Sequence, residues 1–321
     1  MSRLVAVLVA LPFLAGGVTA AVSADRGEVL FSFADHAIVE SSGLVARDGL
    51  VSTVNDSGDS GRVFTVDGTG RTVGVTTFAD APVDVEALAP AGPGEVWVGD
   101  IGDNTASRDS VRVTRVPVGR GPRTGAFPAY ELVYAGGARD AETLLADPRT
   151  GRLYVVSKEI FGGTVYAAPK VLREDRPNRL EPVADAIPIA TDGAFWPDGR
   201  HLVVRGYGRA VVYAWPSMRA VADLDLPDQD QGEGIAVTED GRVLVSTEGQ
   251  FTDVLQVPLP REARQALESR AGQPDEPPAA PAVEAEPRDV AGLPVWLLLG
   301  GGACMVAVAL AGVVGWVVRR R

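Results

Sequence analysis

The stretch EALAPAGPGEVWVGD, residues 86–100, contains the pattern that decides the fold. An acidic residue, Glu86, and a small residue, Ala87, open a short apolar strand. A Gly/Pro cluster at 91–94 ends this strand, and a second apolar strand follows and ends in Gly99-Asp100. Gly and Pro clusters between two short apolar runs are typical of a hairpin turn. The stretch therefore predicts two antiparallel strands, the first of which opens on an acidic side chain.

The same pattern, opened by a polar residue, occurs five times along the chain. The repeats open at Ser42, Glu86, Glu142, Asp192 and Glu233, which are 41 to 56 residues apart. A period of this size, filled with short strands, is typical of a β-propeller blade. We therefore predict an all-β domain at residues 25–260, a β-propeller of five blades. Six blades is the alternative if one degenerate repeat is present, and a β-sandwich with a chance similarity between its strands is another.

The two ends of this domain support a closed ring. The fifth repeat ends after its third strand, at 253–257, and lacks an outer strand. An apolar run at 28–33 lies before the first repeat and has no other partner in the pattern. We expect it to supply the missing strand, because such closure removes the exposed sheet edges.

The segments outside the domain predict that the protein is exported and anchored in a membrane. Residues 1–24 have the basic start, apolar run and small residues of a signal peptide, with an uncleaved anchor as the alternative. Residues 261–292 are rich in Pro, Ala and Glu, which predicts a stalk that opens with a short helix. Residues 293–318 carry no charge and are long enough to span a bilayer, and the arginines at 319–321 place the C-terminus in the cytoplasm. We therefore predict a single-pass cell-membrane protein with an extracellular domain.

Composition limits the partners. The formal net charge is −12, which argues against nucleic acid as a partner. The one cysteine, Cys304, lies in the predicted span, so the domain has no disulfide within the chain. The expected partners are the cytoplasmic membrane, through the C-terminal helix, and an extracellular ligand or protein that the sequence does not identify.

The acidic residues of the repeats are candidate metal ligands. In a propeller the innermost strands line a central channel, so Glu86, Glu142, Asp192 and Glu233 are expected to converge at one mouth. Clustered carboxylates repel one another unless they are protonated or share a cation, and oxygen ligands suit Ca²⁺. The alternative is that each carboxylate accepts hydrogen bonds from backbone amides of the next blade. The loop containing Asp100 and Asp103 is a second oxygen-rich candidate, with a turn capped by its own side chains as the alternative.

These motifs resemble those of phytase-like and esterase-like-phytase β-propellers of bacterial cell surfaces. The resemblance lies in the strand openings at 84–88, 140–144 and 231–235 and in Gly99-Asp100-Ile101-Gly102-Asp103-Asn104, within residues 40 to 250. It implies a propeller that binds calcium, and in some members hydrolysis of phosphate esters.

The sequence favours a binding or scaffold module over an enzyme. A complete nucleophile or general acid–base set is missing: the GDSG segment at 58–61 resembles a protease nucleophile segment, but neither His36 nor His201 has a supporting motif. Lys158, Arg205 and Asp56 end second strands of three repeats and are candidate ligand-binding residues at the mouth. A calcium-dependent phosphoric-ester hydrolase, in which the two cations hold ester oxygens, is the alternative function.

The predicted topology leads to a first test on intact cells. Protease treatment should release a fragment that ends within residues 261–292, because the stalk is expected to be extended and outside the membrane. The fragment is identified by mass spectrometry of the supernatant. If only permeabilised cells yield this fragment, the predicted orientation is wrong.

Overall fold

The structure is a computed structural model that describes residues 27–56, 58–78 and 81–269. These residues form β-strands joined by turns, and a helix, α2 (Arg261–Ser269), follows the last strand. The predicted signal peptide at 1–24, the predicted span at 293–318, the tail at 319–321 and most of the predicted stalk lie outside the described residues. Within the described part of the chain, no helix has the length and apolar character needed to cross a bilayer.

The described strands pair into five units of four antiparallel strands each. The first contains β2 (Ser41–Arg47), β3 (Leu50–Asn55), β4 (Arg62–Val66) and β5 (Thr72–Phe78), and the second β6 (Val85–Gly92), β7 (Glu95–Asp100), β8 (Val111–Pro117) and β10 (Ala129–Tyr134). The third contains β11 (Ala141–Ala146), β12 (Leu153–Ser157), β13 (Gly163–Ala167) and β14 (Asn178–Ala186), and the fourth β15 (Asp192–Phe195), β16 (His201–Arg205), β17 (Arg209–Ala214) and β18 (Arg219–Asp225). The fifth contains β19 (Gly232–Val237), β20 (Val243–Thr247), β21 (Asp253–Val257) and, from the other end of the chain, β1 (Glu28–Ser32).

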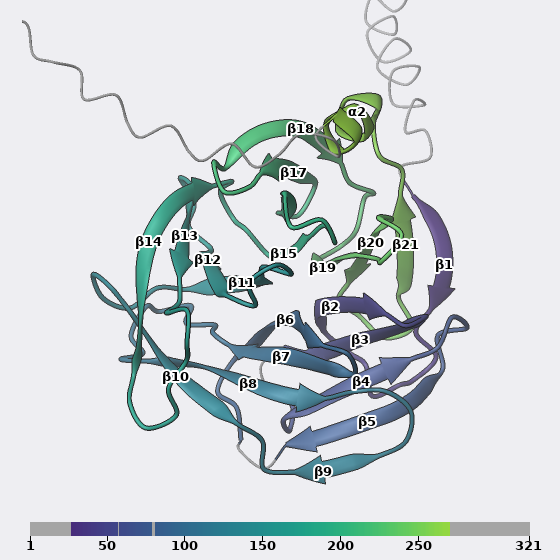
Figure 1. The fold of residues 1–321 in the computed structure, drawn as a ribbon. Helices are drawn as coiled ribbons and strands as arrows, with labels where there is room; N and C mark the ends of the chain where they lie inside the picture. The colour runs from purple at the N-terminus through teal and green to yellow at the C-terminus, as the bar shows by residue number, and fades with distance from the viewer. Residues whose placement is uncertain (1–26, 57, 79–80, 270–321) are drawn as a thin grey trace, which may run out of the picture. The chain divides into compact units, whose positions relative to one another are not determined.

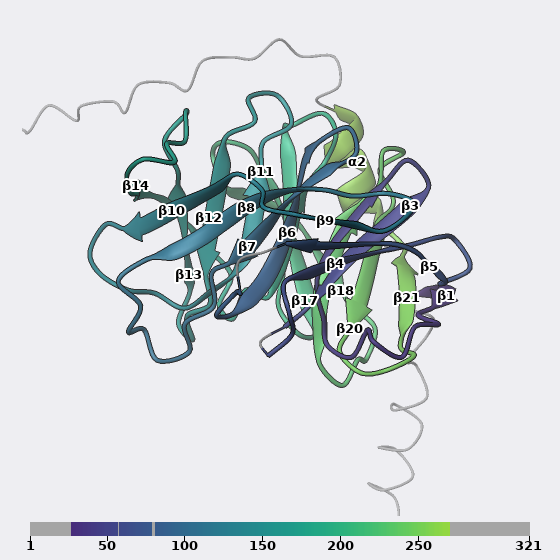
Figure 2. The same ribbon diagram turned by 90° about the horizontal axis from the view of Figure 1, so that it is seen from below.

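The five units lie around a common axis, with the first strand of each unit at the centre (Figure 1). Figure 2 shows the same strands from a perpendicular direction. Each of the inner strands β2, β6, β11, β15 and β19 contacts the inner strand of the next unit, and β19 contacts β2, so the ring is closed. The prediction of an all-β, propeller-like domain is thus confirmed. The strands β1 and β21 pair antiparallel, as expected for an N-terminal strand that completes the last unit.

Two short parallel pairings add to this plan. The strand β9 (Arg123–Gly125) pairs with β5 at the outside of the first unit. The outer strands β10 and β14 pair over three residues each, which joins the second and third units into one eight-stranded sheet.

Apolar side chains fill the space between neighbouring units. Five clusters of buried residues each combine residues from two adjacent units, and the cluster between the fourth and fifth units also includes Ala263 and Leu267 of α2. The start of the predicted stalk is therefore a helix that packs on the domain. Since every cluster needs both of its units, the core depends on the closed ring.

The small residue in each repeat reflects the close approach of the inner strands. A Cβ atom on Gly43 would lie 2.2 Å from the backbone nitrogen of Leu88 in the next unit. A Cβ atom on Gly234 would lie 2.5 Å from Ser246 Oγ and 2.7 Å from the carbonyl oxygen of Ser42. Real Cβ atoms do not approach other atoms so closely, and backbone atoms cannot simply rotate away.

This crowding leads to a prediction about stability. Gly43→Ala should lower the free energy of unfolding by about 3 kcal/mol, because the added methyl group has to push two strands apart. Gly68→Ala is the matched control, since a Cβ atom there meets nothing within 4 Å. Denaturant unfolding of both variants measures the difference. Equal stabilities of the two variants would contradict the close approach of β2 and β6.

Candidate functional site

The repeat positions Ser42, Glu86, Glu142, Asp192 and Glu233 all lie at the start of an inner strand and are buried. Since the inner strands are equivalent members of one ring, these side chains lie at the same end of it. The contacts of the five side chains divide them into two groups.

Asp192 and Ser42 bind the backbone of the next unit. One carboxylate oxygen of Asp192 accepts a hydrogen bond from the Gly193 amide at 2.8 Å, and the other accepts from the Ile235 amide at 2.8 Å. The Ser42 hydroxyl donates to the carbonyl oxygen of Glu86 at 2.7 Å. Asp192 therefore has the backbone-bonding role that was the alternative to metal binding, and one of its oxygens joins the fourth unit to the fifth.

The glutamates form the second group and retain unused oxygens. Lys158 Nζ forms an ion pair with Oε1 of Glu142. The second oxygens, Oε2 of Glu142 and Oε2 of Glu233, are buried and have no hydrogen-bond partner among the described residues. A buried carboxylate oxygen without a partner is costly, so this end of the channel favours protons or a cation.

Burial and mutual repulsion raise the pKa values of these carboxyl groups. Burial, followed by repulsion from Glu142, Asp56 and Asp84, raises the pKa of Glu86 to about 11. Burial and then the charge of Glu233 raise the pKa of Glu142, whereas the Lys158 ammonium lowers it. Burial also raises the pKa of Glu233.

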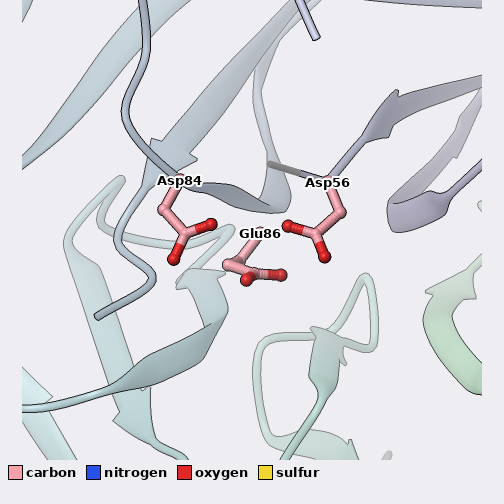
Figure 3. A group of neighbouring side chains, drawn as sticks. All are labelled: Asp56, Asp84 and Glu86. Carbon is pink, nitrogen blue, oxygen red and sulfur yellow. The ribbon is translucent and has the colours of Figure 1, made fainter. Parts of the chain in front are cut away.

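Three carboxylates from two units meet at the mouth. Oxygen atoms of Asp56, Asp84 and Glu86 all lie within 4.8 Å of one another. Asp56 follows β3 of the first unit, Asp84 precedes β6 and Glu86 is the second residue of β6. Figure 3 shows the three side chains gathered around one region. Burial first, and then the charge of Asp56, raise the pKa of Asp84 to about 6. This geometry suits a cation held by oxygen atoms.

A glycine gives these carboxylates room. A Cβ atom on Gly102 would lie 2.4 Å from an Asp84 carboxylate oxygen and 2.8 Å from Glu86 Cγ. The Gly102 amide also donates to the carbonyl oxygen of Asp84 at 3.2 Å. The loop after β7 therefore lies against one side of the cluster, and a side chain at this residue would displace the Asp84 carboxylate.

Asp100 and Asp103 hold this loop in place. Asp100 accepts hydrogen bonds from the amides of Val83 and Asp84 at 3.2 and 2.9 Å and forms an ion pair with Arg108 at 2.9 Å. Asp103 accepts from the amides of Ser107 and Arg108 at 2.9 and 2.8 Å. Asp103 thus caps a turn of its own loop, whereas Asp100 binds the backbone of a segment earlier in the chain and positions Asp84.

The candidate ligand-binding cations have different surroundings. Arg205 is fully buried, and its guanidinium donates to carbonyl oxygens of Gly206, Tyr207, Gly234 and Ser246 and to the Gln229 side chain. Burial lowers its pKa to about 10. Lys158 lies at the mouth, and its Nζ also donates to the Tyr207 hydroxyl at 3.1 Å. Of the three predicted residues, Lys158 and Asp56 face the mouth, whereas Arg205 joins the fourth unit to the fifth.

Two acidic residues of the mouth were not predicted as site residues. The sequence could have predicted Asp84 as a site residue. It lies two residues before Glu86, and residues i and i+2 of an extended chain point to the same side. Glu248 follows β20, and burial, then the charges of Glu233 and Asp56, raise its pKa to about 7. Its role depends on the packing of the fifth unit beside the first, which a single strand does not reveal.

The comparisons with known proteins leave the family open. No family model matches the chain, and no curated protein matches it in sequence. Among solved structures, the glutaminyl cyclase of Myxococcus xanthus is similar, with a TM-score of 0.46 and 12% identity over 72% of this chain and 95% of that chain. A likeness this remote assigns neither a family nor an activity, and the resemblance to phytase-like propellers stays an expectation from the sequence.

The crowded carboxylates lead to a prediction about how the stability of the fold depends on pH when a chelator keeps the site free of metal ions. Asp84 and Glu248 bind protons more tightly in the folded than in the unfolded chain, because their pKa values are raised to about 6 and about 7. The stability that they contribute therefore falls as the pH rises from about 4 through about 7. Denaturant unfolding of Glu248→Gln should show a smaller loss of stability across this window than the wild type.

The control for this experiment is Glu131→Gln, since Glu131 is exposed on the outer strand β10. It should keep the pH dependence of the wild type. A wild-type slope in Glu248→Gln would contradict the electrostatic description of the mouth.

Proposed function

We propose that the chain is a membrane-anchored extracellular binding module, a five-bladed β-propeller that holds a Ca²⁺ ion at one mouth of its channel. The observation that carries this proposal is the meeting of Asp56, Asp84 and Glu86, whose carboxylate oxygens lie within 4.8 Å of one another. The anchor and the extracellular side rest on the segments at 1–24 and 293–321 of the sequence.

The residues present fit a calcium ion. All donors are oxygen atoms, which hard cations prefer, and Ca²⁺ completes a coordination shell of six to eight oxygens with water. Asp56 and Asp84 are half-buried, so water reaches the cluster, while Glu86 is buried behind them. The unpartnered oxygens of Glu142 and Glu233 add negative potential behind the site. A divalent cation relieves the repulsion that otherwise keeps protons on these groups.

The contacts of the two candidate cations favour binding over phosphate-ester hydrolysis. A hydrolase of highly charged esters needs cationic groups directed at the ester oxygens. The Arg205 guanidinium is directed at backbone carbonyl groups, and Lys158 is paired with Glu142. Displacing either contact would leave a buried charge without compensation. Hydrolysis therefore has weaker support than binding.

The proposal predicts stabilisation by calcium. At a hundredfold excess over the dissociation constant, Ca²⁺ should add roughly 2.7 kcal/mol to the free energy of unfolding of the purified full chain. Mg²⁺ should add less, because it gives up its water reluctantly. Thermal unfolding with chelator, Ca²⁺ and Mg²⁺ measures both effects.

Three variants define the site in this experiment. Glu86→Gln removes a ligand charge and Gly102→Ala displaces the Asp84 carboxylate, so both should lose most of the calcium response. Glu131→Gln, which changes a carboxylate remote from the mouth, should keep it. Identical thermal unfolding curves of the wild type in chelator, Ca²⁺ and Mg²⁺ would contradict the proposal that the mouth binds a cation.

A further inference from the structure

Large apolar side chains are exposed on the loops around the acidic mouth. They are Val83, Ile160, Phe161, Tyr207 and Phe251, here called the apolar tips. Phe161 is fully exposed to solvent, with a relative accessibility of 101%. Exposed aromatic and aliphatic residues that gather on one face of a protein mark an interaction surface.

The strand pairing places these loops on the same face as the mouth. In the third, fourth and fifth units the start of the inner strand lies opposite the end of the second strand, as in the pairs Asp192 with Arg205 and Gly232 with Thr247. The loops that follow β12, β16 and β20 therefore leave the sheets beside Glu142, Asp192 and Glu233. These loops carry four of the five apolar tips.

Each apolar tip lies beside a charged residue of the mouth. Val83 directly precedes Asp84, and Ile160 and Phe161 follow Lys158 by two and three residues. The Tyr207 ring lies 5.3 Å from Lys158 Nζ, and its hydroxyl accepts a hydrogen bond from the same atom. Phe251 follows Glu248 by three residues. The apolar tips therefore lie on the loops that carry or contact the charged groups of the mouth.

Acidic side chains are concentrated at the centre of this face. Asp56, Asp84, Glu86, Glu142, Glu233 and Glu248 act on one another electrostatically, and Lys158 opposes them. The Oε2 atoms of Glu142 and Glu233 belong to residues that are 5% and 3% exposed, and neither atom has a hydrogen-bond partner among the described residues. A partner that brings a positive charge to the mouth would be attracted by these acidic groups.

We propose that this face docks a basic, apolar polypeptide segment of another protein. Apolar side chains of the segment contact the apolar tips, and a lysine or arginine side chain is directed at the carboxylates of the mouth. Charge complementarity sets the class of partner, since an anionic membrane surface or an acidic peptide would be repelled. The inference deepens the proposed binding role by naming its partner class.

A random twelve-residue peptide library displayed on phage tests this proposal with the full chain as the target. The enriched peptides should combine lysine or arginine with aromatic or large aliphatic residues. The double variant Phe161→Ser/Phe251→Ser should lose this enrichment. The double variant Val171→Ser/Val183→Ser is the matched control, because both valines are exposed but lie on the loop after β13 and on the outer strand β14.

Affinities of one enriched synthetic peptide then give the size of the effect. The tip variant should bind it at least about tenfold more weakly than the wild type, as expected for aromatic anchors, while the control variant binds it equally well. Raising the salt concentration should weaken binding, because exposed charges are screened. Unchanged melting temperatures show that both variants are folded.

Several outcomes would overturn the proposal. They are enrichment of acidic or purely polar peptides, no enrichment, equal selection by the tip and control variants, or binding of the chain to anionic phosphatidylserine vesicles in place of peptides. The calcium response of the tip variant separates the two proposals. If calcium still stabilises this variant and the wild type while the peptide selection fails, only the docking inference is lost.

Discussion

The inner strands of neighbouring units approach one another so closely that several positions between them have no room for a methyl group. This constraint is seen at Gly43 and Gly234, each of which follows a polar residue at the start of its inner strand. Because the strands form a closed ring, these polar residues then share one mouth. Four of the five are acidic, so the same crowding that allows the ring to close also brings like charges together.

The chain relieves this repulsion in different ways in different units. Asp192 accepts hydrogen bonds from two backbone amides, which oppose the rise that burial causes in its pKa. Glu142 is paired with Lys158, which leaves one oxygen without a partner. Glu86 has Asp56 and Asp84 beside it and forms no ion pair with a basic residue among the described residues, and repulsion adds to burial in raising its pKa. The first two arrangements stabilise the fold, whereas the third suits a cation from outside.

Much of the architecture was predictable because it follows from local patterns. The turn clusters and short apolar runs gave the strands, and the spacing of the repeat gave the units and the N-terminal strand that completes the last one. The site was less predictable, since Glu86 and Asp192 occupy equivalent places in the repeat but differ in the backbone amides that reach them. Arg205 looked like a ligand-binding cation at the end of a strand, yet its guanidinium is enclosed by carbonyl groups of the next unit. Such differences arise from packing between units.

Calcium at the meeting point of Asp56, Asp84 and Glu86 is the claim on which the proposed role depends. An anomalous difference map from a crystal of the protein grown with Ca²⁺ tests it most directly. The result expected from the geometry is a peak within bonding distance of oxygen atoms of all three residues, with water completing its shell. A map without a peak at the mouth, from a crystal in which calcium is in large excess, would contradict it.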